Sequence, residues 1–232
     1  MVSVKESLLE LLEQNKGSFV SSSVVTGKLS VSRNAIWKAV NELRQAGYDI
    51  DSVPNKGYML STDSDIISPK GIEAFLINKS LSQSIVVFDE ADSTNVIAKL
   101  NLVNAVSDKK IFVAKQQTGG KGHGNTNFQS PEGGVYLSII ASPKNGNGEY
   151  KKASEIGKKV LKVLKKEIGS ELTIDKKNNG IYSGEEKICG ILTEYIADLE
   201  TGERSNYIIG IGIQPGNYAK NRLIAKLIEE LC

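Results

Sequence analysis

A glycine-rich stretch, QTGGKGHGNTNF from Gln117 to Phe128, contains residue types that bind phosphate groups. It holds four glycines, Lys121 and the only histidine of the chain, His123. Glycines leave backbone N–H donors unhindered, and a cation beside them stabilises negative charge. We therefore expect this loop to face a phosphate-bearing ligand.

The composition limits the class of protein to which the loop can belong. The 232 residues are 40% apolar and 24% charged, which is typical of a globular chain with one large or two unequal domains. A net charge of +2 means that any DNA contact must come from a local basic face. The polar start MVSVKESLLE and the lack of a long apolar run argue against a signal peptide and a membrane partner, so we expect a cytoplasmic protein.

Histidine and cysteine are too sparse for several kinds of chemistry. With one histidine and two distant cysteines, we expect no metal site and no histidine-based catalytic triad. Cys189 lies inside the apolar stretch KICGILTEYI, where a small buried side chain is expected rather than a disulfide partner.

Residues 1–62 predict a winged helix-turn-helix domain. The stretch VKESLLELLEQN carries a broad leucine stripe, and SSSVVTGKLS predicts a second helix of about two turns before a tight turn. A third helix follows. The segments YDIDSV and KGYML then alternate apolar and polar residues, as a wing hairpin does. In this arrangement the third helix enters the DNA major groove.

The third helix, SRNAIWKAVNELRQAG, has Ser32 as its expected N-cap and ends at Gly47. Its outward face is polar and cationic, and an ordinary solvated surface is the alternative interpretation. The residues of the predicted DNA-binding face are Ser32, Arg33, Asn34, Trp37, Lys38 and Asn41. Arginine and lysine suit phosphates, and the amides and the indole suit base edges or thymine methyls. Trp37 could equally pack beneath the wing.

A polar linker, residues 63–70, precedes an α+β domain over residues 71–232. Strands are expected at SIVVF, KIFVAK, GVYLSIIA, KICGILTEYI and NYIIGIGI. Helices are expected after Ser93, over residues 148–169 and from Asn221. This order predicts a mixed, mostly antiparallel sheet with helices. We expect the many lysines of the 148–169 helix to face solvent rather than an anionic partner.

Five motifs of the second domain occur in one order: DSTN, QTGGKG, SPEGGVYLS, KICGILTEY and GIGI. In order and spacing they resemble the catalytic core of biotin protein ligases. With the winged helix-turn-helix ahead of it, residues 1–213 resemble the bifunctional form that is also the biotin operon repressor. The resemblance implies that the chain binds biotin and ATP with Mg²⁺, makes biotinyl-5'-AMP, and passes biotin to a carrier-protein lysine.

The resemblance also implies site residues. It places biotin contacts at Ser93, Thr94, Asn95, Gln117, Gly133, Gly134, Tyr136 and Gly190, the adenylate loop at Gly120, Lys121, Gly122 and His123, and the nucleotide side at Lys176, Asn179 and Gln214. Ser93, Thr94 and Gln117 would meet the ureido group, and the strand of Tyr136 would line an apolar slot. Gly190 would allow close backbone approach. Lys187 matches the family's catalytic lysine, which bonds the adenylate linkage.

The departures from the family lie on the nucleotide side. The family loop has the form G-R-G-R-x-G-R-x-W, whereas Lys121, His123, Thr126 and Phe128 stand at its arginines and tryptophan. The family motif K-W-P-N-D is KKNNG, with Gly180 where an aspartate serves the nucleotide. Each lost charged contact costs about 1.5–3 kcal/mol, which weakens adenylate retention. The family's small SH3-like C-terminal domain has no counterpart in the sequence.

Three interpretations are compatible with these residues. The first is a biotin-responsive repressor that binds operator DNA, as a homodimer, with weak or lost ligase activity and with biotin or biotinyl-AMP as its effector. The alternative is an active bifunctional biotin–[acetyl-CoA-carboxylase] ligase that biotinylates a biotin carboxyl carrier protein. The third is a chain that only keeps the fold. We favour the first, because the biotin-side residues remain and the nucleotide-side residues do not.

Overall fold

The structure is a computed structural model, and it describes residues 3–104, 107–108, 110–142, 153–169, 171–175, 177, 179–197 and 204–232. The chain folds into two compact units. The first unit comprises Met1–Lys79 with Lys220–Arg222, and the second comprises Ser80–Ala219 with Leu223–Cys232.

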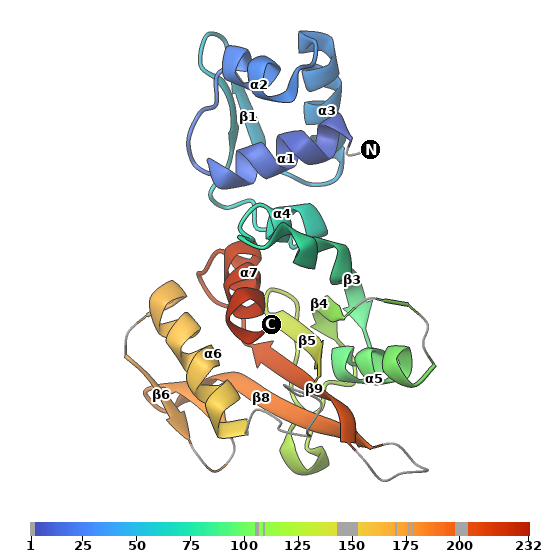
Figure 1. The fold of residues 1–232 in the computed structure, drawn as a ribbon. Coiled ribbons are helices and arrows are strands. Elements are labelled where there is room, and N and C mark those ends of the chain that lie inside the picture. The colour runs from blue at the N-terminus through green and yellow to red at the C-terminus, as the bar shows by residue number, and fades with distance from the viewer. Residues whose placement is uncertain are drawn as a thin grey trace. The chain divides into compact units, whose positions relative to one another are not determined.

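The first unit is the predicted winged helix-turn-helix (Figure 1). Its elements are α1 (Val4–Gln14), α2 (Ser22–Leu29), α3 (Arg33–Gln45), β1 (Ile50–Val53), β2 (Gly57–Leu60) and α4 (Pro69–Glu73). Apolar side chains of the three longer helices and of the hairpin bury one core that includes Leu8, Leu12, Ile36 and Leu60. The predicted third helix begins as expected at its N-cap Ser32 and ends one residue earlier, at the C-cap Ala46.

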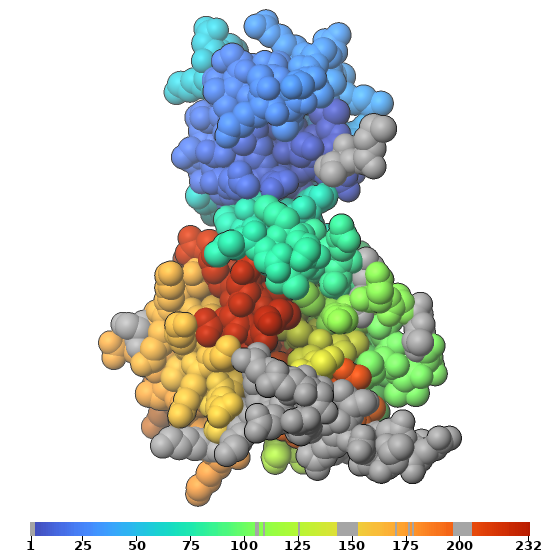
Figure 2. Space-filling model, in the orientation of Figure 1, coloured from blue at the N-terminus to red at the C-terminus, as the bar shows by residue number. Residues whose placement is uncertain are grey.

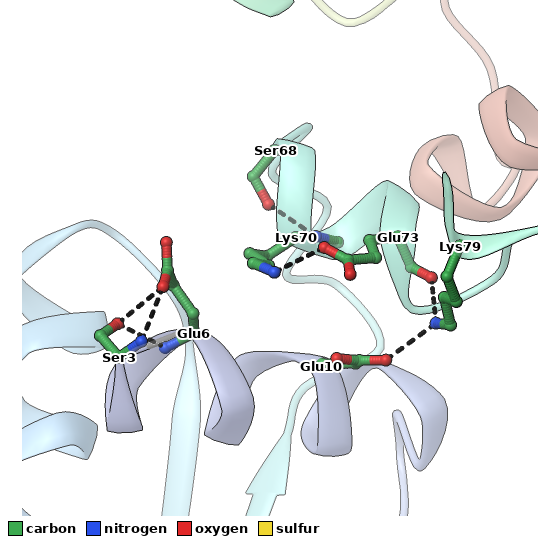
Figure 3. Close-up of polar contacts among 8 residues, drawn as sticks. Ser3, Glu6, Glu10, Ser68, Lys70, Glu73 and Lys79 are labelled. Carbon is green, nitrogen blue, oxygen red and sulfur yellow. Dashed lines mark hydrogen bonds and ion pairs between the residues drawn. The ribbon is translucent and has the colours of Figure 1, made fainter. Parts of the chain in front are cut away.

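Helix α4, which the sequence analysis did not predict, packs against α1 (Figure 3). Its N-cap is Ser68, whose hydroxyl accepts from the Gly71 N–H at 3.0 Å. Past the helix, Lys79 Nζ lies 2.8 Å from Glu10 Oε1 on α1 and 2.5 Å from the Glu73 carbonyl oxygen. The segment after the wing is therefore bonded to the first helix of the same unit.

The second unit contains the predicted mixed sheet. Its strands are β3 (Ile85–Ala91), β4 (Ile111–Gln117), β5 (Val135–Ala141), β6 (Leu172–Asp175), β7 (Gly180–Ser183), β8 (Glu186–Ala197) and β9 (Arg204–Ile213). The strand order is β3-β4-β5-β9-β8-β7-β6. Only the β3–β4 pair is parallel, so the expected mostly antiparallel character is confirmed.

Helices cover the sheet and position its functional residues. They are α5 (Thr94–Asn104), α6 (Ala153–Glu167) and α7 (Lys220–Leu231), with short 3-10 turns η1 (Lys79–Ser84) and η2 (His123–Asn125). Helix α5 contacts β4, β5 and β9, and α6 contacts β6 and β8. Side chains 135–140 of β5 are buried on both faces, as expected of a covered central strand.

Helices α6 and α7 lie side by side at the surface of the second unit (Figure 2). Lys162 Nζ lies 2.9 Å from Glu230 Oε2, and Lys159 Nζ donates to the Glu230 carbonyl oxygen at 2.7 Å. Lys158, Lys165 and Lys166 are exposed, in agreement with the predicted solvent-facing lysines of this helix. Residues 148–152 of the predicted helix lie outside the described residues.

Candidate ligand-binding site and DNA-binding face

A cavity of about 300 Å³ lies in the second unit, between the start of α5, the loop after β4 and the strands β8 and β9. Nine residues of the predicted site line it: Ser93, Thr94, Asn95, Gln117, Lys121, Gly122, His123, Lys187 and Gly190. These residues come from three segments that are distant in sequence. The fold therefore brings together most of the side chains that the motifs singled out.

A hydrogen-bonded relay holds the polar wall of the cavity. Gln117 Oε1 accepts from the Thr94 N–H at 2.8 Å and lies 3.1 Å from the Thr94 hydroxyl. Its Nε2 donates to the Ser130 hydroxyl at 2.9 Å. The buried Ser138 hydroxyl lies 2.7 Å from Thr94 Oγ1 and 2.6 Å from Asn95 Oδ1. Because the relay fixes these groups, Thr94 and Gln117 face the cavity in defined orientations.

Two glycines of neighbouring strands form an apolar floor. Gly190 on β8 pairs with Gly212 on β9. The Phe128 ring covers both, since a Cβ built on Gly212 would lie 2.3 Å from its Cε1 and one on Gly190 would lie 2.7 Å from its Cε2. Gly190 allows a close approach, and in this structure the approaching group is the aromatic ring of the loop; the predicted approach to a ligand stays a prediction.

Two of the four glycines in the loop do not offer the free backbone donors that the sequence predicts. The Gly119 N–H donates to the Asp92 carbonyl at 2.8 Å, and the Gly122 N–H donates to the Thr126 carbonyl at 2.7 Å. The Phe128 N–H bonds back to the Gly120 carbonyl at 2.9 Å. The expectation of unhindered N–H groups is therefore wrong for Gly119 and Gly122, because the first bonds the Asp92 carbonyl and the second bonds a carbonyl within the loop.

Three cations and potential cations reach the cavity. Lys121, His123 and Lys187 all line it and are all exposed to solvent. Within the described residues, the ammonium group of Lys187 has no ion pair or hydrogen bond. Because the Lys187 ammonium group makes no such contact, it can bond an anionic ligand without first breaking an internal contact.

Other predicted biotin contacts do not line the cavity. Tyr136 is fully buried, and its hydroxyl donates to the Pro131 carbonyl at 2.7 Å. Burial raises the pKa of Tyr136 to about 12. Gly134 leaves room for that hydroxyl, because a Cβ there would lie 2.2 Å from it. Gly133, with a φ of 94°, lies against Pro215. These residues support the strand behind Phe128 instead.

The predicted nucleotide side is not gathered at the cavity among the described residues. Gly120 is buried beneath the loop, beside the Phe128 carbonyl and the Ser130 hydroxyl. Gln214 Nε2 donates to the Gln129 carbonyl at 3.1 Å. Asn179 has a φ of 52° and lies before β7 with its amide near Gly157 of α6. Lys176 lies outside the described residues.

Sequence reasoning missed several residues of the site. The cavity is also lined by Thr126, Asn127, Phe128, Ile191, Leu192, Gly210, Ile211 and Gly212. Gly210 and Gly212 alternate along a strand, so their common face could have been inferred. Ser138 is a lone polar residue in an apolar strand, and that pattern signals a buried hydrogen-bonded group. Glu194 also belongs to the site, since its Oε2 accepts from Asn95 Nδ2 at 2.7 Å. No feature of the sequence around Glu194 indicated this role.

The predicted DNA-binding face is the outer side of α3 in the first unit. Ser32 caps the helix, since its hydroxyl accepts from the Ala35 N–H at 3.2 Å. Arg33, Asn34, Trp37 and Lys38 are exposed, and Asn41 is half-buried. Trp37 is 65% exposed, which excludes packing beneath the wing as core. The ion pair of Lys38 with Glu42 spans 4.0 Å at the surface, so it leaves the lysine available for phosphates.

Arg44, on the same helix, is bonded to the wing. Its Nη2 donates to the Ile50 carbonyl at 2.6 Å and to the Ser52 hydroxyl at 2.9 Å. The basic residue nearest the end of α3 therefore orients β1. This contact fixes the wing hairpin relative to the helix that carries the DNA-binding face.

The prediction for Cys189 is confirmed. Its side chain is fully buried in β8, and neither cysteine of the chain forms a disulfide. Burial raises the pKa of the Cys189 thiol to about 12. The described residues include no cluster of three or more histidine, cysteine or acidic side chains that could hold a metal. No helix in the described ranges combines the length and apolarity needed to cross a bilayer.

The fold and the cavity define a two-part protein in which a helix-turn-helix unit precedes a ligand-binding α+β unit. Residues 4–59 match the model of an HTH domain, and residues 87–214 match the model of the Biotin/lipoate A/B protein ligase family. The second match covers more than half of the chain. The chain belongs to the Biotin/lipoate A/B protein ligase family and carries a helix-turn-helix domain ahead of the ligase-family region.

Curated relatives share this organisation. The chain is 31% identical over 221 residues to the bifunctional ligase/repressor BirA of Bacillus subtilis (strain 168), which covers 93% of the chain and 67% of that protein. It is 29% identical over 216 residues to the bifunctional ligase/repressor BirA of Escherichia coli (strain K12), covering 92% of the chain and 64% of that protein. The chain thus spans about two thirds of the length of these relatives.

A solved structure agrees on the fold. The biotin acetyl coenzyme A carboxylase synthetase from Helicobacter pylori, with bound biotinylated ATP, superposes with a TM-score of 0.50 at 23% sequence identity. The match covers 63% of the chain and 72% of that protein. At this identity the likeness concerns the fold alone.

Proposed function

We propose that the chain is a biotin-responsive, DNA-binding transcriptional repressor in which biotin ligase activity is weak or lost. The observation that carries the proposal is the contrast between two parts of the cavity. The relay through Thr94 and Gln117 is complete, whereas the N–H groups of Gly119 and Gly122 in the glycine loop are already bonded to backbone carbonyls. The exposed polar and cationic face of α3 supports the DNA-binding half.

The cavity has the size and chemistry of a biotin pocket. Its volume of about 300 Å³ lies at the lower end of the range for small-molecule sites. One wall carries the amide and hydroxyl groups of Gln117 and Thr94, which suit a ureido ring. The glycine floor and the Phe128 ring offer an apolar surface to a thiophane ring.

The same cavity is a poor fit for a nucleoside triphosphate with Mg²⁺. No carboxylate is among the described residues that line it, so Mg²⁺ would lack its preferred ligands. Gly180, where the family has an aspartate, is the first residue of β7. With Lys121 and His123 in place of arginines, phosphate contacts are single rather than bidentate. These features support slow adenylation and poor retention of biotinyl-AMP.

The proposal is tested by measuring DNA binding with and without biotin. We expect fluorescence anisotropy on duplex DNA from upstream of biotin genes to give tighter binding when biotin is added. Arg33→Ala and Lys38→Ala should each weaken binding. Each should also reduce the slope of log affinity against log salt concentration by about one, because each removes a phosphate contact. Lys5→Ala on α1 is the matched control. Unchanged binding in both α3 variants would contradict the proposal.

The repressor is expected to act as a homodimer, because helix-turn-helix proteins gain useful affinity from two half-sites. Sedimentation with operator DNA should give two chains per duplex. A footprint that covers one half-site, with one chain bound, would contradict this part of the proposal.

An active bifunctional biotin–[acetyl-CoA-carboxylase] ligase is the second candidate, and the uncommitted ammonium group of Lys187 in the cavity favours it. The test incubates the chain with biotin, ATP, Mg²⁺ and a biotin carboxyl carrier protein, followed by a blot for biotin. We expect slow labelling that also reaches bystander proteins. Rapid labelling of the carrier alone would support the second candidate, and Gly180→Asp with His123→Arg should raise a slow rate.

A further inference from the structure

Glu194 lies behind the polar wall of the cavity and has no role assigned so far. It comes from the middle of β8 and does not line the cavity. Its carboxylate accepts a hydrogen bond from Asn95 Nδ2 at 2.7 Å. The Asn95 amide lies over Gly210, where an added Cβ would lie 2.3 Å from Asn95 Oδ1. The absence of a side chain at Gly210 therefore leaves the space that the Asn95 amide occupies.

The carboxylate sets the direction of the hydrogen bonds that run from Glu194 through Asn95 to Ser138, whereas the backbone N–H of Thr94 fixes Gln117 Oε1 as an acceptor. A carboxylate only accepts, so Asn95 must turn its nitrogen toward Glu194 and its oxygen toward Ser138. Amide oxygen also only accepts, so the Ser138 hydroxyl gives its single proton to Asn95 Oδ1 at 2.6 Å. Ser138 then has only lone pairs left for its neighbour.

The neighbour is Thr94, whose hydroxyl lines the cavity. With the Ser138 proton already used, Thr94 must donate its own proton inward, to Ser138 Oγ at 2.7 Å or to Gln117 Oε1 at 3.1 Å. Its lone pairs then face the cavity. A ligand that presents an N–H group meets an acceptor there, whereas a sulfur or hydrocarbon edge leaves that acceptor unsatisfied.

We propose that Glu194 is a positioning residue that makes the Thr94 hydroxyl a hydrogen-bond acceptor, so that the cavity selects a ligand with a urea or amide N–H. The inference deepens the proposed function, on which it rests. The family includes ligases for biotin and for lipoate. Biotin carries two ureido N–H groups, whereas the dithiolane ring of lipoate carries none. The relay gives a physical basis for preferring biotin.

The first experiment measures the affinities of biotin and lipoate by calorimetry for the intact chain and for Glu194→Gln. A glutamine keeps the size of the side chain, but its amide can bond Asn95 in either orientation, so the direction of the relay is no longer enforced. We expect biotin to bind about three- to tenfold more weakly, a change of up to ~1.4 kcal/mol, with lipoate affinity unchanged. Glu186→Gln, on the exposed start of the same strand, is the matched control.

The second experiment exchanges the two groups. Asn95→Asp alone places two carboxylates together and should abolish biotin binding. In Asn95→Asp with Glu194→Gln, the carboxylate introduced at position 95 accepts from both neighbours, so Ser138 still donates to that position and most of the affinity should return. Relief of carboxylate repulsion alone would restore biotin affinity only together with thermal stability, whereas the relay predicts that biotin affinity changes in variants of parent-like stability. Thermal unfolding of each variant, which should stay within a few degrees of the parent, checks the fold.

Several outcomes would overturn the assignment. One is a double variant that binds no better than Asn95→Asp, and another is an unchanged ratio of biotin to lipoate affinity in Glu194→Gln. If the parent binds biotin in both cases, the proposed function stands and only the role of Glu194 fails. A parent chain that binds neither probe would contradict both.

Discussion

Phe128 and Gly212 lie so close that a side chain added at Gly212 must displace the Phe128 ring. An ideal Cβ on Gly212 would lie 2.3 Å from Phe128 Cε1, well inside contact distance. We expect Gly212→Ala to displace the ring and lower stability by about 1 kcal/mol, the low end of the cost of overpacking. Phe128→Ala in the same chain should recover part of that loss. Thermal and urea unfolding of the four chains form a double-mutant cycle.

Gly169→Ala is the control for that cycle, because no atom lies within 4 Å of a Cβ built at Gly169. It should be close to neutral. Strictly additive effects of Gly212→Ala and Phe128→Ala would mean that the ring and the glycine floor are energetically independent.

The buried hydroxyl of Tyr136 makes stability depend on alkaline pH. Burial raises its pKa from 10.0 to about 12, so the unfolded chain loses this proton first. The stabilisation is complete below pH 10 and is lost as the pH rises through 12, at about 1.4 kcal/mol per unit. The free energy of unfolding, measured in urea from pH 9 to 11.5, should fall more steeply with pH in the parent than in Tyr136→Phe.

The remaining slope of Tyr136→Phe should include Cys189, whose pKa burial also raises to about 12, and Tyr48, whose pKa burial raises above its ordinary value. At pH 7, Tyr136→Phe should cost about 0.5–1.5 kcal/mol, because the bond to the Pro131 carbonyl is lost. Equal pH slopes for parent and variant would contradict the role of Tyr136.

At the scale of elements, the N-terminus of α3 depends on one side chain. The Ser32 hydroxyl accepts from the Ala35 N–H at 3.2 Å and caps the helix that carries the DNA-binding face. We expect Ser32→Ala to lower the free energy of unfolding of the first unit by about 1 kcal/mol. Ser32→Thr keeps the capping oxygen and should behave like the parent. Circular dichroism during urea unfolding measures both, and indistinguishable curves for Ser32→Ala and the parent would refute the cap.

The elements that the sequence predicted are those with a strong local signal. The amphipathic patterns of α1, α3 and α6 and the apolar runs of β4, β5, β8 and β9 all lie within a few residues of their predicted places. The cap at Ser32 could be read directly from residue type. Because four of the five motifs lie on or next to these strands, nine of the cavity-lining residues could be predicted as well.

The elements that were missed depend on tertiary contacts. Strands β6 and β7 are four residues each and are fixed by pairing with each other and with β8. Helix α4 has five residues and is held by packing on α1. Asn179 and Gln214 were assigned by motif position alone, yet their amides bond or contact structural neighbours. The local sequence pattern does not indicate such partners, because they are distant in the sequence.

At the scale of the whole molecule, the proposed function requires that ligand and DNA binding be linked. If biotin raises the affinity for operator DNA by some factor, thermodynamic linkage requires DNA to raise the affinity for biotin by the same factor. We expect calorimetric titration of biotin into the DNA complex and into the DNA-free chain to give this factor. It should match the ratio from anisotropy with and without biotin. Two unequal factors would mean that the assays report different species.

The rate at which the buried thiol of Cys189 is modified should report how often strand β8 opens. The thiolate is the form that attacks a thiol reagent, and both burial and the raised pKa withhold that form while β8 stays paired. Cys232 is exposed, so it should be modified within the mixing time. The second modification should then proceed at the rate at which the strand opens, and mass spectrometry would follow it. A ligand seated on the other face of β8 should slow that second step in proportion to its occupancy. The labelling rate would then measure binding without any signal from the ligand itself.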